Sequence, residues 1–131
     1  MKYIVIVGCG KIGKELAVQL SKTENVVMVD KDLEALNSLG DDFNGKKIWG
    51  DALDMNTLNA AGIKEANSVF LITGNDNLNL VVGKVVKRKY EIKEVSLLVN
   101  DDVKRQTFQE EGLTIVNRTN LMVGVLKRSI T

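Results

Sequence analysis

The chain has 131 residues, and its 18 basic and 17 acidic side chains leave a net charge of +1. This balance gives no electrostatic reason to expect nucleic acid or anionic lipid as a partner. One cysteine and no histidine exclude an internal disulfide and remove the commonest general acid/base and metal ligand. Few apolar residues precede Gly8, and no later run reaches the roughly 18 that span a bilayer, so we expect neither a signal peptide nor membrane insertion.

Short apolar runs alternate with amphipathic stretches along the chain. Apolar runs predict strands at 3–7, 26–29, 47–49, 69–72, 95–99 and 114–116, of which the first two have the continuous apolar, mostly β-branched character of strands buried in a parallel sheet. Apolar residues at helical spacing predict the helices between them. The first predicted helix has a stripe of Ile12, Leu16, Ala17 and Leu20, and the second is capped by Asp32 and carries Leu33, Leu36 and Leu39. Four more are predicted over 55–61, 77–90, 103–111 and 121–130. The stripe of the helix over 77–90 contains Leu80, Val81, Val85 and Val86.

Strand–helix alternation of this kind is typical of a parallel sheet with right-handed crossovers. Six strands in two halves predict an α/β, Rossmann-type doubly wound parallel six-stranded sheet with the strand order 3-2-1-4-5-6. The chain has no proline and no low-complexity tract that would mark a linker. We therefore expect one domain over residues 1–131.

A glycine loop joins the first strand to the first helix, with the sequence Gly8-Cys9-Gly10-Lys11-Ile12-Gly13. Glycines at this spacing gain weight from the preceding strand and the following helix. Gly8 permits a tight turn, Gly10 lets the backbone approach a pyrophosphate, and Gly13 lets the helix pack closely on the strand. Free N–H groups and the helix dipole favour an anion here, so we expect the loop to bind a nucleotide's phosphates.

Asp30 closes the second strand, about 20 residues after the loop. Its carboxylate can accept hydrogen bonds from ribose hydroxyls and would repel a 2′-phosphate, which favours NAD or adenosine nucleotides over NADP. Lys31 weakens that exclusion, and the alternative is that Asp30 is a polar strand end in a vestigial site. Cys9 has two interpretations: a thiol activated by the helix N-terminus for redox chemistry, or a small residue that fits between two glycines.

Further polar strings follow the later strands: Gly50-Asp51-Ala52, then Thr73-Gly74-Asn75-Asp76 with Asn79 just after it, then Val99-Asn100-Asp101, and a last string over 111–116. In this order and spacing the chain resembles the N-terminal regulatory domain of potassium transporters and channels, known as TrkA-N, KTN or RCK. The resemblance covers nearly the whole chain, and these later strings are more specific than the glycine loop.

The resemblance implies a nucleotide-binding gating subunit and not an enzyme. Its ligand would be NAD(H) or an adenine nucleotide (ATP, ADP or AMP). Homodimers would assemble into a larger ring, alone or with a second RCK-type subunit, on the cytoplasmic face of a membrane-embedded potassium-conducting protein. By position, the family's adenine contact falls on Asp51 and Ala52, its ribose contact on Asp30 beside Lys31, its phosphate contacts on Gly10, Lys11 and Ile12, and the far side of its cleft on Thr73, Gly74, Asn75 and Asp76. An N-cap for a helix starting near Leu53 is the alternative role for Asp51.

The chain departs from the family in two places. Many members carry an arginine in the fifth strand where this chain has Leu98. Its loss disfavours strong engagement of a third phosphate and favours diphosphate, monophosphate or dinucleotide ligands. Many members also continue into a C-terminal lobe beyond the position of Thr131, and the sequence leaves open whether such a lobe belongs to this protein.

The last helix carries more apolar surface than one core contact needs, at Leu121, Met122, Val123, Val125, Leu126 and Ile130. An exposed patch of this kind usually marks an association surface. Since related domains use this helix to pack on a partner, we expect a dimerisation helix over about 119–131, with folding back onto the sheet as the alternative. The basic face of the helix over 77–90 is interpreted as solvated, with docking of an acidic partner as its alternative.

The expected function is therefore a cytoplasmic regulatory subunit of potassium transport, peripheral to the inner face of the membrane through its partner. The alternative from another class is the cofactor domain of an NAD-dependent oxidoreductase. That chemistry needs a proton donor and a substrate pocket, usually from a second domain. A nucleotide-dependent interaction module unrelated to potassium is a third possibility. No catalytic residue and no metal site are expected.

Overall fold

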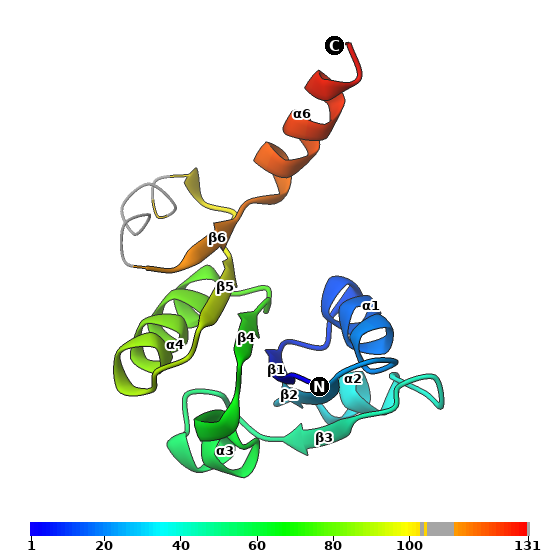
Figure 1. Cartoon of the computed structure of the whole chain (residues 1–131), viewed down its shortest axis with the longest axis vertical. Helices are drawn as coiled ribbons and strands as arrows, with labels where there is room; N and C mark the ends of the chain where they lie inside the picture. Colours follow the sequence, from blue (N-terminus) through cyan, green and yellow to red (C-terminus); the bar gives the residue numbers. More distant parts are fainter. Residues whose placement is uncertain (103, 105–111, 131) are drawn as a thin grey trace.

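Six parallel strands in one sheet organise the chain in the computed structural model, which describes residues 1–102, 104 and 112–130 (Figure 1). The strands are β1 (Tyr3–Val7), β2 (Asn25–Asp30), β3 (Lys46–Trp49), β4 (Ser68–Leu71), β5 (Glu94–Leu98) and β6 (Thr114–Val116). Their order is β3-β2-β1-β4-β5-β6, so the predicted Rossmann-type topology is confirmed.

Helices follow the strands in alternation. They are α1 (Lys11–Leu20), α2 (Leu33–Asn37), α3 (Met55–Ala60), the short 3-10 helix η1 (Ile63–Glu65), α4 (Asp76–Lys89) and α6 (Arg118–Arg128). Asp32 caps α2 as predicted, because its carboxylate accepts hydrogen bonds from the amides of Glu34 and Ala35. The helix expected over 103–111 lies outside the described residues, apart from position 104.

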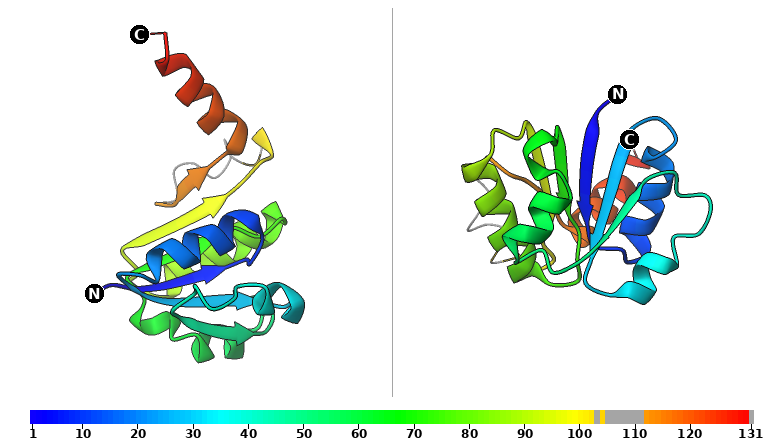
Figure 2. Two further views of the ribbon diagram at one scale, coloured as in Figure 1. Left: turned by 90° about the vertical axis from the view of Figure 1, so that its right-hand side faces the viewer. Right: turned by 90° about the horizontal axis from the view of Figure 1, so that it is seen from below.

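The sheet is covered on both faces, by α1 and α2 on one side and by α3 and α4 on the other (Figure 2). Successive residues of a strand point to opposite faces. Ile4 and Ile6 of β1 accordingly pack in the core beneath α1 and α2, whereas Val5 and Val7 pack in the other core. This double burial explains why β1 and β2 have continuous apolar runs and not an alternating pattern, whereas β3 at the edge of the sheet is largely exposed.

The central strand β1 pairs with β2 on one side and β4 on the other, and its last residue Val7 lies opposite Val29 and Leu71. The segments after these three strands therefore all leave the sheet at its carboxyl end. The connection after β1 runs through α1 to β2, whereas the connection after β4 runs through α4 to β5 in the opposite direction. The gap between these two connections is the topological switch point of the sheet. Ligands of open α/β sheets bind at such a point.

Two of the predicted apolar stripes are only partly buried. Ile12 at the start of α1 is 46% exposed, since α1 approaches the sheet through its small residues Gly13 and Ala17. In α4 the buried face contains Leu80, Val82, Gly83 and Val86. Val81 and Val85 were expected in the core but face outward, because α4 is rotated so that Gly83 lies against the side chain of Leu97.

The terminal helix α6 leads away from the sheet and buries none of its residues (Figures 1 and 2). Leu121, Met122 and Leu126 are each more than half exposed. The alternative that this helix folds back onto its own sheet is therefore wrong for this chain, since α6 continues past the sheet edge once β6 is in place. No helix in the described ranges has both the length and the apolar character to cross a membrane.

Candidate functional site

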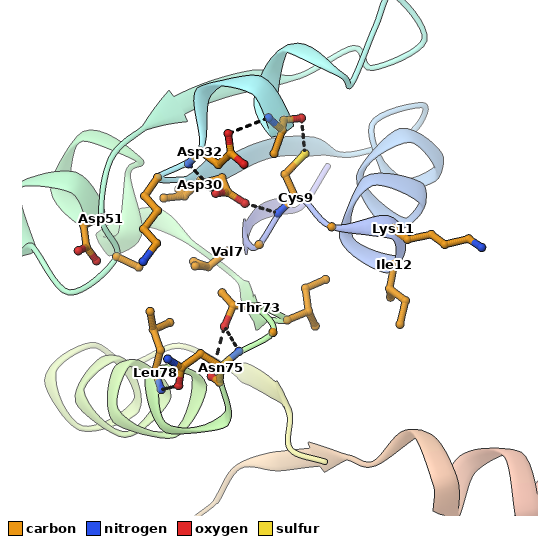
Figure 3. Close-up of a pocket in the computed structure, with 18 of the residues that line it drawn as sticks. Val7, Cys9, Lys11, Ile12, Asp30, Asp32, Asp51, Thr73, Asn75 and Leu78 are labelled. Carbon is orange, nitrogen blue, oxygen red and sulfur yellow. Dashed lines mark hydrogen bonds between the residues drawn. The ribbon is translucent and has the colours of Figure 1, made fainter. Parts of the chain in front are cut away.

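A cleft of about 460 Å³ opens at the carboxyl ends of β1, β2, β3 and β4 (Figure 3). Its volume falls within the roughly 300–1,000 Å³ of small-molecule sites. All but two of the predicted site residues line it: Gly8, Gly10, Lys11, Ile12, Asp30, Lys31, Asp51, Ala52, Thr73, Gly74 and Asn75. The exceptions are Gly13 and Asp76, which the structure places outside the lining.

Each of the three loop glycines is required, or tolerated, for a different physical reason. Gly8 has φ +116°, and a Cβ there would lie 2.8 Å from the backbone of Ile72 and Thr73. Gly13 does not line the cleft, and its role is in packing. A Cβ added there would lie 1.9 Å from the carbonyl oxygen of Gly8, so only glycine lets α1 approach the loop this closely. A Cβ at Gly10 would meet nothing within 4 Å, so the backbone at Gly10 stays open to an approaching ligand.

The N-terminus of α1 has no side-chain cap, since its N-cap residue is Gly10. In the described part of the chain the other α-helices are capped by a side-chain oxygen, from Asp32, Asp54, Asn75 or Asn117. The first-turn amides of α1 therefore lack the acceptor that the other helices have. Uncapped amides and the helix dipole at the edge of a cleft are suited to an anion such as a phosphate.

Asp30 is held rigidly at the end of β2. Its Oδ2 accepts a hydrogen bond from the Cys9 amide at 2.7 Å, and its Oδ1 accepts one from the Asp32 amide at 2.8 Å. These contacts tie the β2 terminus to the glycine loop. Each carboxylate oxygen keeps acceptor capacity beyond these bonds, so Asp30 can still accept from a hydroxyl group in the cleft.

Cys9 is buried, and its Sγ donates to the carbonyl oxygen of Ala35 at 3.2 Å. Burial raises the pKa of the Cys9 thiol, and the negative charge of Asp30 raises it further. The helix N-terminus was the reason to consider an activated thiolate here. These opposing effects keep the thiol neutral, which supports its interpretation as a small residue between two glycines.

At the other end of the cleft, Asp51 lies far from Lys11 and Ile12 (Figure 3). Its Oδ1 accepts from the Leu53 amide at 2.9 Å, in a turn that precedes α3. The predicted alternative of a helix N-cap at Asp51 is wrong, because α3 begins at Met55 and is capped by Asp54. The neighbouring Trp49 side chain is 65% exposed, and its indole N–H donates to the Lys31 carbonyl oxygen.

A hydrogen-bonded cluster forms the wall beyond β4. The Thr73 hydroxyl donates to Oδ1 of Asn79 at 2.6 Å, and the buried Asn79 amide donates to the Leu98 carbonyl oxygen at 2.8 Å. Asn75 caps α4. Asp76 accepts from the amides of Asn100 and Asp101, so its carboxylate holds the segment after β5 and does not face the cleft.

Arg118 also lines the cleft, although the sequence did not indicate it. It is the first residue of α6, and only the position of β6 at the sheet edge brings it to the cleft. The sole signal in the sequence was a basic residue two positions after the last strand. Leu98, at the position where the resemblance led us to expect an arginine, is buried. Asp32, Ala35 and Leu78 are further lining residues that were not predicted.

Metal ligands do not gather anywhere in the described ranges. Across residues 1–102, 104 and 112–130, no group of three or more Cys, Asp or Glu side chains lies close enough together to hold a metal ion.

The sheet order and the position of the cleft define a Rossmann domain with its ligand cleft at the switch point. The chain belongs to the TrkA-N domain family, which matches residues 4–118. A Trk system potassium uptake protein TrkA of Streptomyces coelicolor is 30% identical over 115 residues, covering 87% of this chain and 52% of that protein. A TrkA homolog of Pyrococcus horikoshii is 31% identical over 109 residues, covering 82% and 48%. The chain thus spans about half the length of these curated relatives.

Solved structures with the same fold include the TrkA-N domain of the inner membrane protein ybaL from Escherichia coli, with TM-score 0.86, 15% identity and coverage of 99% of this chain and 97% of that chain. The Kef CTD of Shewanella denitrificans in AMP-bound form has TM-score 0.77 and 19% identity, over 95% and 80%. The GsuK channel bound to NAD has TM-score 0.74 and 20% identity, over 88% and 21%. GsuK is also known bound to ADP. These likenesses show the shared fold.

Proposed function

We propose that this chain is a nucleotide-binding regulatory domain of a potassium uptake system or channel. The observation that carries the proposal is the uncapped N-terminus of α1 beside Asp30, inside one cleft of a TrkA-N family member. The loop amides are suited to phosphate, and the carboxylate is suited to ribose hydroxyls. The names of the relatives support the link to potassium transport.

The ligand proposed is NAD(H) or an adenine nucleotide. In this arrangement the adenine lies at Asp51 and Ala52, the ribose at Asp30 beside Lys31, and the phosphates at Gly10, Lys11 and Ile12. Thr73, Gly74 and Asn75 form the opposite wall, while Gly13 and Asp76 act on the shape of the site from outside it. Structural neighbours described as bound to NAD, ADP or AMP support this choice of ligand.

A thermal-shift panel with NAD⁺, NADH, ATP, ADP and AMP tests nucleotide binding. A ligand at about 100 times its dissociation constant stabilises the folded protein by roughly 2.7 kcal/mol. We expect a clear rise in the melting temperature with at least one of these nucleotides. NADP⁺, added as a comparison with NAD⁺, should have a smaller effect because Asp30 repels a 2′-phosphate. An unchanged melting temperature with every nucleotide refutes the proposed function.

The proposed assembly is a homodimer within a larger ring, in which residues 1–131 form one TrkA-N domain and about 119–131 the interface helix. Exposed apolar side chains on α6 support it. Ligand exchange would change the angle between the two domains, to the extent that the ligand binds the two arrangements with different affinity. The ring would sit on the cytoplasmic face of its membrane partner and act on the pore without catalysing a reaction.

The role of α6 is tested by sedimentation of Leu126→Glu. Leu126 is 62% exposed, so the variant should fold normally but lose the dimer. Lys127→Glu places the same side chain one residue further along the helix and should remain dimeric. A monomeric wild-type protein at high concentration contradicts the proposed assembly. An assay for nicotinamide turnover with candidate substrates tests the oxidoreductase alternative, and we expect none.

A further inference from the structure

Arg118 brings a guanidinium to the nucleotide cleft from a distant part of the chain. It is exposed, and within the described residues no hydrogen bond or ion pair holds its side chain. Arginine is the side chain best suited to phosphate recognition, because its planar fork donates two parallel hydrogen bonds. A cation at this cleft, without a partner among the described residues and near the uncapped start of α1, is available to a ligand.

The order of the strands decides which part of a ligand Arg118 meets. Asp51 follows β3 and Asp30 follows β2, so both carboxylates lie on one side of the glycine loop. Arg118 follows β6 and lies on the other side, beyond Thr73. A nucleoside on the side of the two carboxylates directs its phosphate chain across the loop towards Arg118.

The start of α6 is anchored in the body of the domain. Asn117 is 5% exposed, and its amide donates to the carbonyl oxygens of Val99 at 3.0 Å and Asn100 at 3.2 Å. Its Oδ1 accepts from the Asn120 amide and so caps α6. Asp76, at the start of α4, accepts a hydrogen bond from the Asn100 amide. The backbone of Arg118 is therefore positioned by the buried Asn117 side chain, while its own side chain has no partner among the described residues.

We propose that Arg118 is a specificity-determining residue that binds the distal phosphate of a nucleoside diphosphate or triphosphate. This inference rests on the proposed nucleotide site. It supplies the cation that is missing at Leu98, so ligands with a distal phosphate are favoured over a monophosphate, contrary to what Leu98 alone indicated. Because Arg118 begins α6, a phosphate bound to it is joined directly to the proposed interface helix.

Isothermal titration with AMP, ADP and ATP tests the assignment, with the fluorescence of the single tryptophan, Trp49, as a second readout beside the cleft. Arg118→Gln should lower the affinity for ADP and ATP about ten- to a hundred-fold, the loss expected for one charge-assisted contact, and should change the affinity for AMP less than threefold. Arg118→Lys should lose less affinity than Arg118→Gln, because lysine keeps the positive charge but not the planar fork of donors. Lys127→Gln removes the same charge from the far end of α6 and should bind all three nucleotides as the wild type does.

The outcomes separate this inference from the function on which it rests. If the wild type binds none of the nucleotides, the proposed function fails and the inference with it. If the wild type binds but Arg118→Gln weakens AMP as much as ATP, or weakens none of them, Arg118 does not read the distal phosphate and the proposed function stands. Equal losses in Arg118→Gln and Lys127→Gln would also overturn the assignment, because they would reflect the general charge of the helix.

Discussion

The closest packing at the glycine loop is the approach of α1 to the Gly8 carbonyl, and Gly13→Ala tests it directly. The new Cβ would lie 1.9 Å from that oxygen, whereas a carbon and a carbonyl oxygen in contact stand about 3.3 Å apart. The loop and α1 must therefore separate by more than about 1 Å. The Cβ is fixed by the helix backbone and the oxygen belongs to the backbone of Gly8, so no side-chain rotation can relieve the contact.

Helix propensity acts in the opposite direction. Replacing glycine by alanine inside a helix stabilises it by about 1 kcal/mol when space is available. Overpacking in a close-packed region costs about 1–3 kcal/mol, and a backbone contact belongs at the upper end of that range. We therefore expect a net loss of about 2 kcal/mol in the free energy of unfolding and a melting temperature lowered by about 8 °C.

Thermal and urea unfolding followed by circular dichroism measure this change. Gly10→Ala is the matched control, since a Cβ there meets nothing within 4 Å and its backbone is extended. The control should melt as the wild type does, yet bind nucleotide weakly because a methyl group now occupies the approach to the loop. A Gly13→Ala protein as stable as the wild type, or more stable, would show that the loop does not hold α1 against the Gly8 carbonyl.

Three further predictions concern the hydrogen bonds of Asn79 and Asp30 and the burial of Cys9. Asn79→Ala leaves the Thr73 amide and the Leu98 carbonyl without their buried partner and should cost about 2–4 kcal/mol, measured by urea unfolding, with Ser96→Ala as a control at a partly buried position. Asp30→Ala should lower adenine nucleotide affinity at least about tenfold by titration calorimetry, and an unchanged affinity would remove Asp30 from the site. Because burial raises the pKa of Cys9, its alkylation at neutral pH should be much slower in the native protein than in urea; equal rates would contradict the burial.

The strands and the glycine loop could be predicted from the sequence because they depend on local order. A continuous β-branched run such as 3–7 is apolar on both faces only if both faces are covered, which already implies helices on each side of a sheet. The loop glycines and Asp30 stand at spacings set by one strand, one turn and one helix. Asp32 could be recognised as a cap for the same reason, since a capping bond spans only a few residues.

Other features were decided by the packing of segments far apart in the chain. The rotation of α4 leaves Val85 exposed although its spacing suited the core, because Gly83 allows closer contact with β5. Asp76 stands beside true lining residues in sequence but points to the segment after β5. Side-chain direction at such positions depends on neighbouring strands, and periodicity contains no information about them.

Ile12 and Arg118 illustrate the same division at the site itself. The sequence alone was enough to predict that a strand, a glycine loop and an acidic strand end would come together in one cleft. The sequence placed Ile12 both in the apolar stripe of α1 and at the phosphate contacts, and it left two positions open for α6; the tertiary structure decided that Ile12 lines the cleft and that α6 extends away from the sheet. Tertiary structure alone decided that Arg118 reaches the cleft from more than a hundred residues beyond the loop. The physical reason is that β6 pairs with β5 at the edge of the sheet, and this pairing places the start of α6 where Arg118 can line the cleft, which no local sequence pattern could indicate.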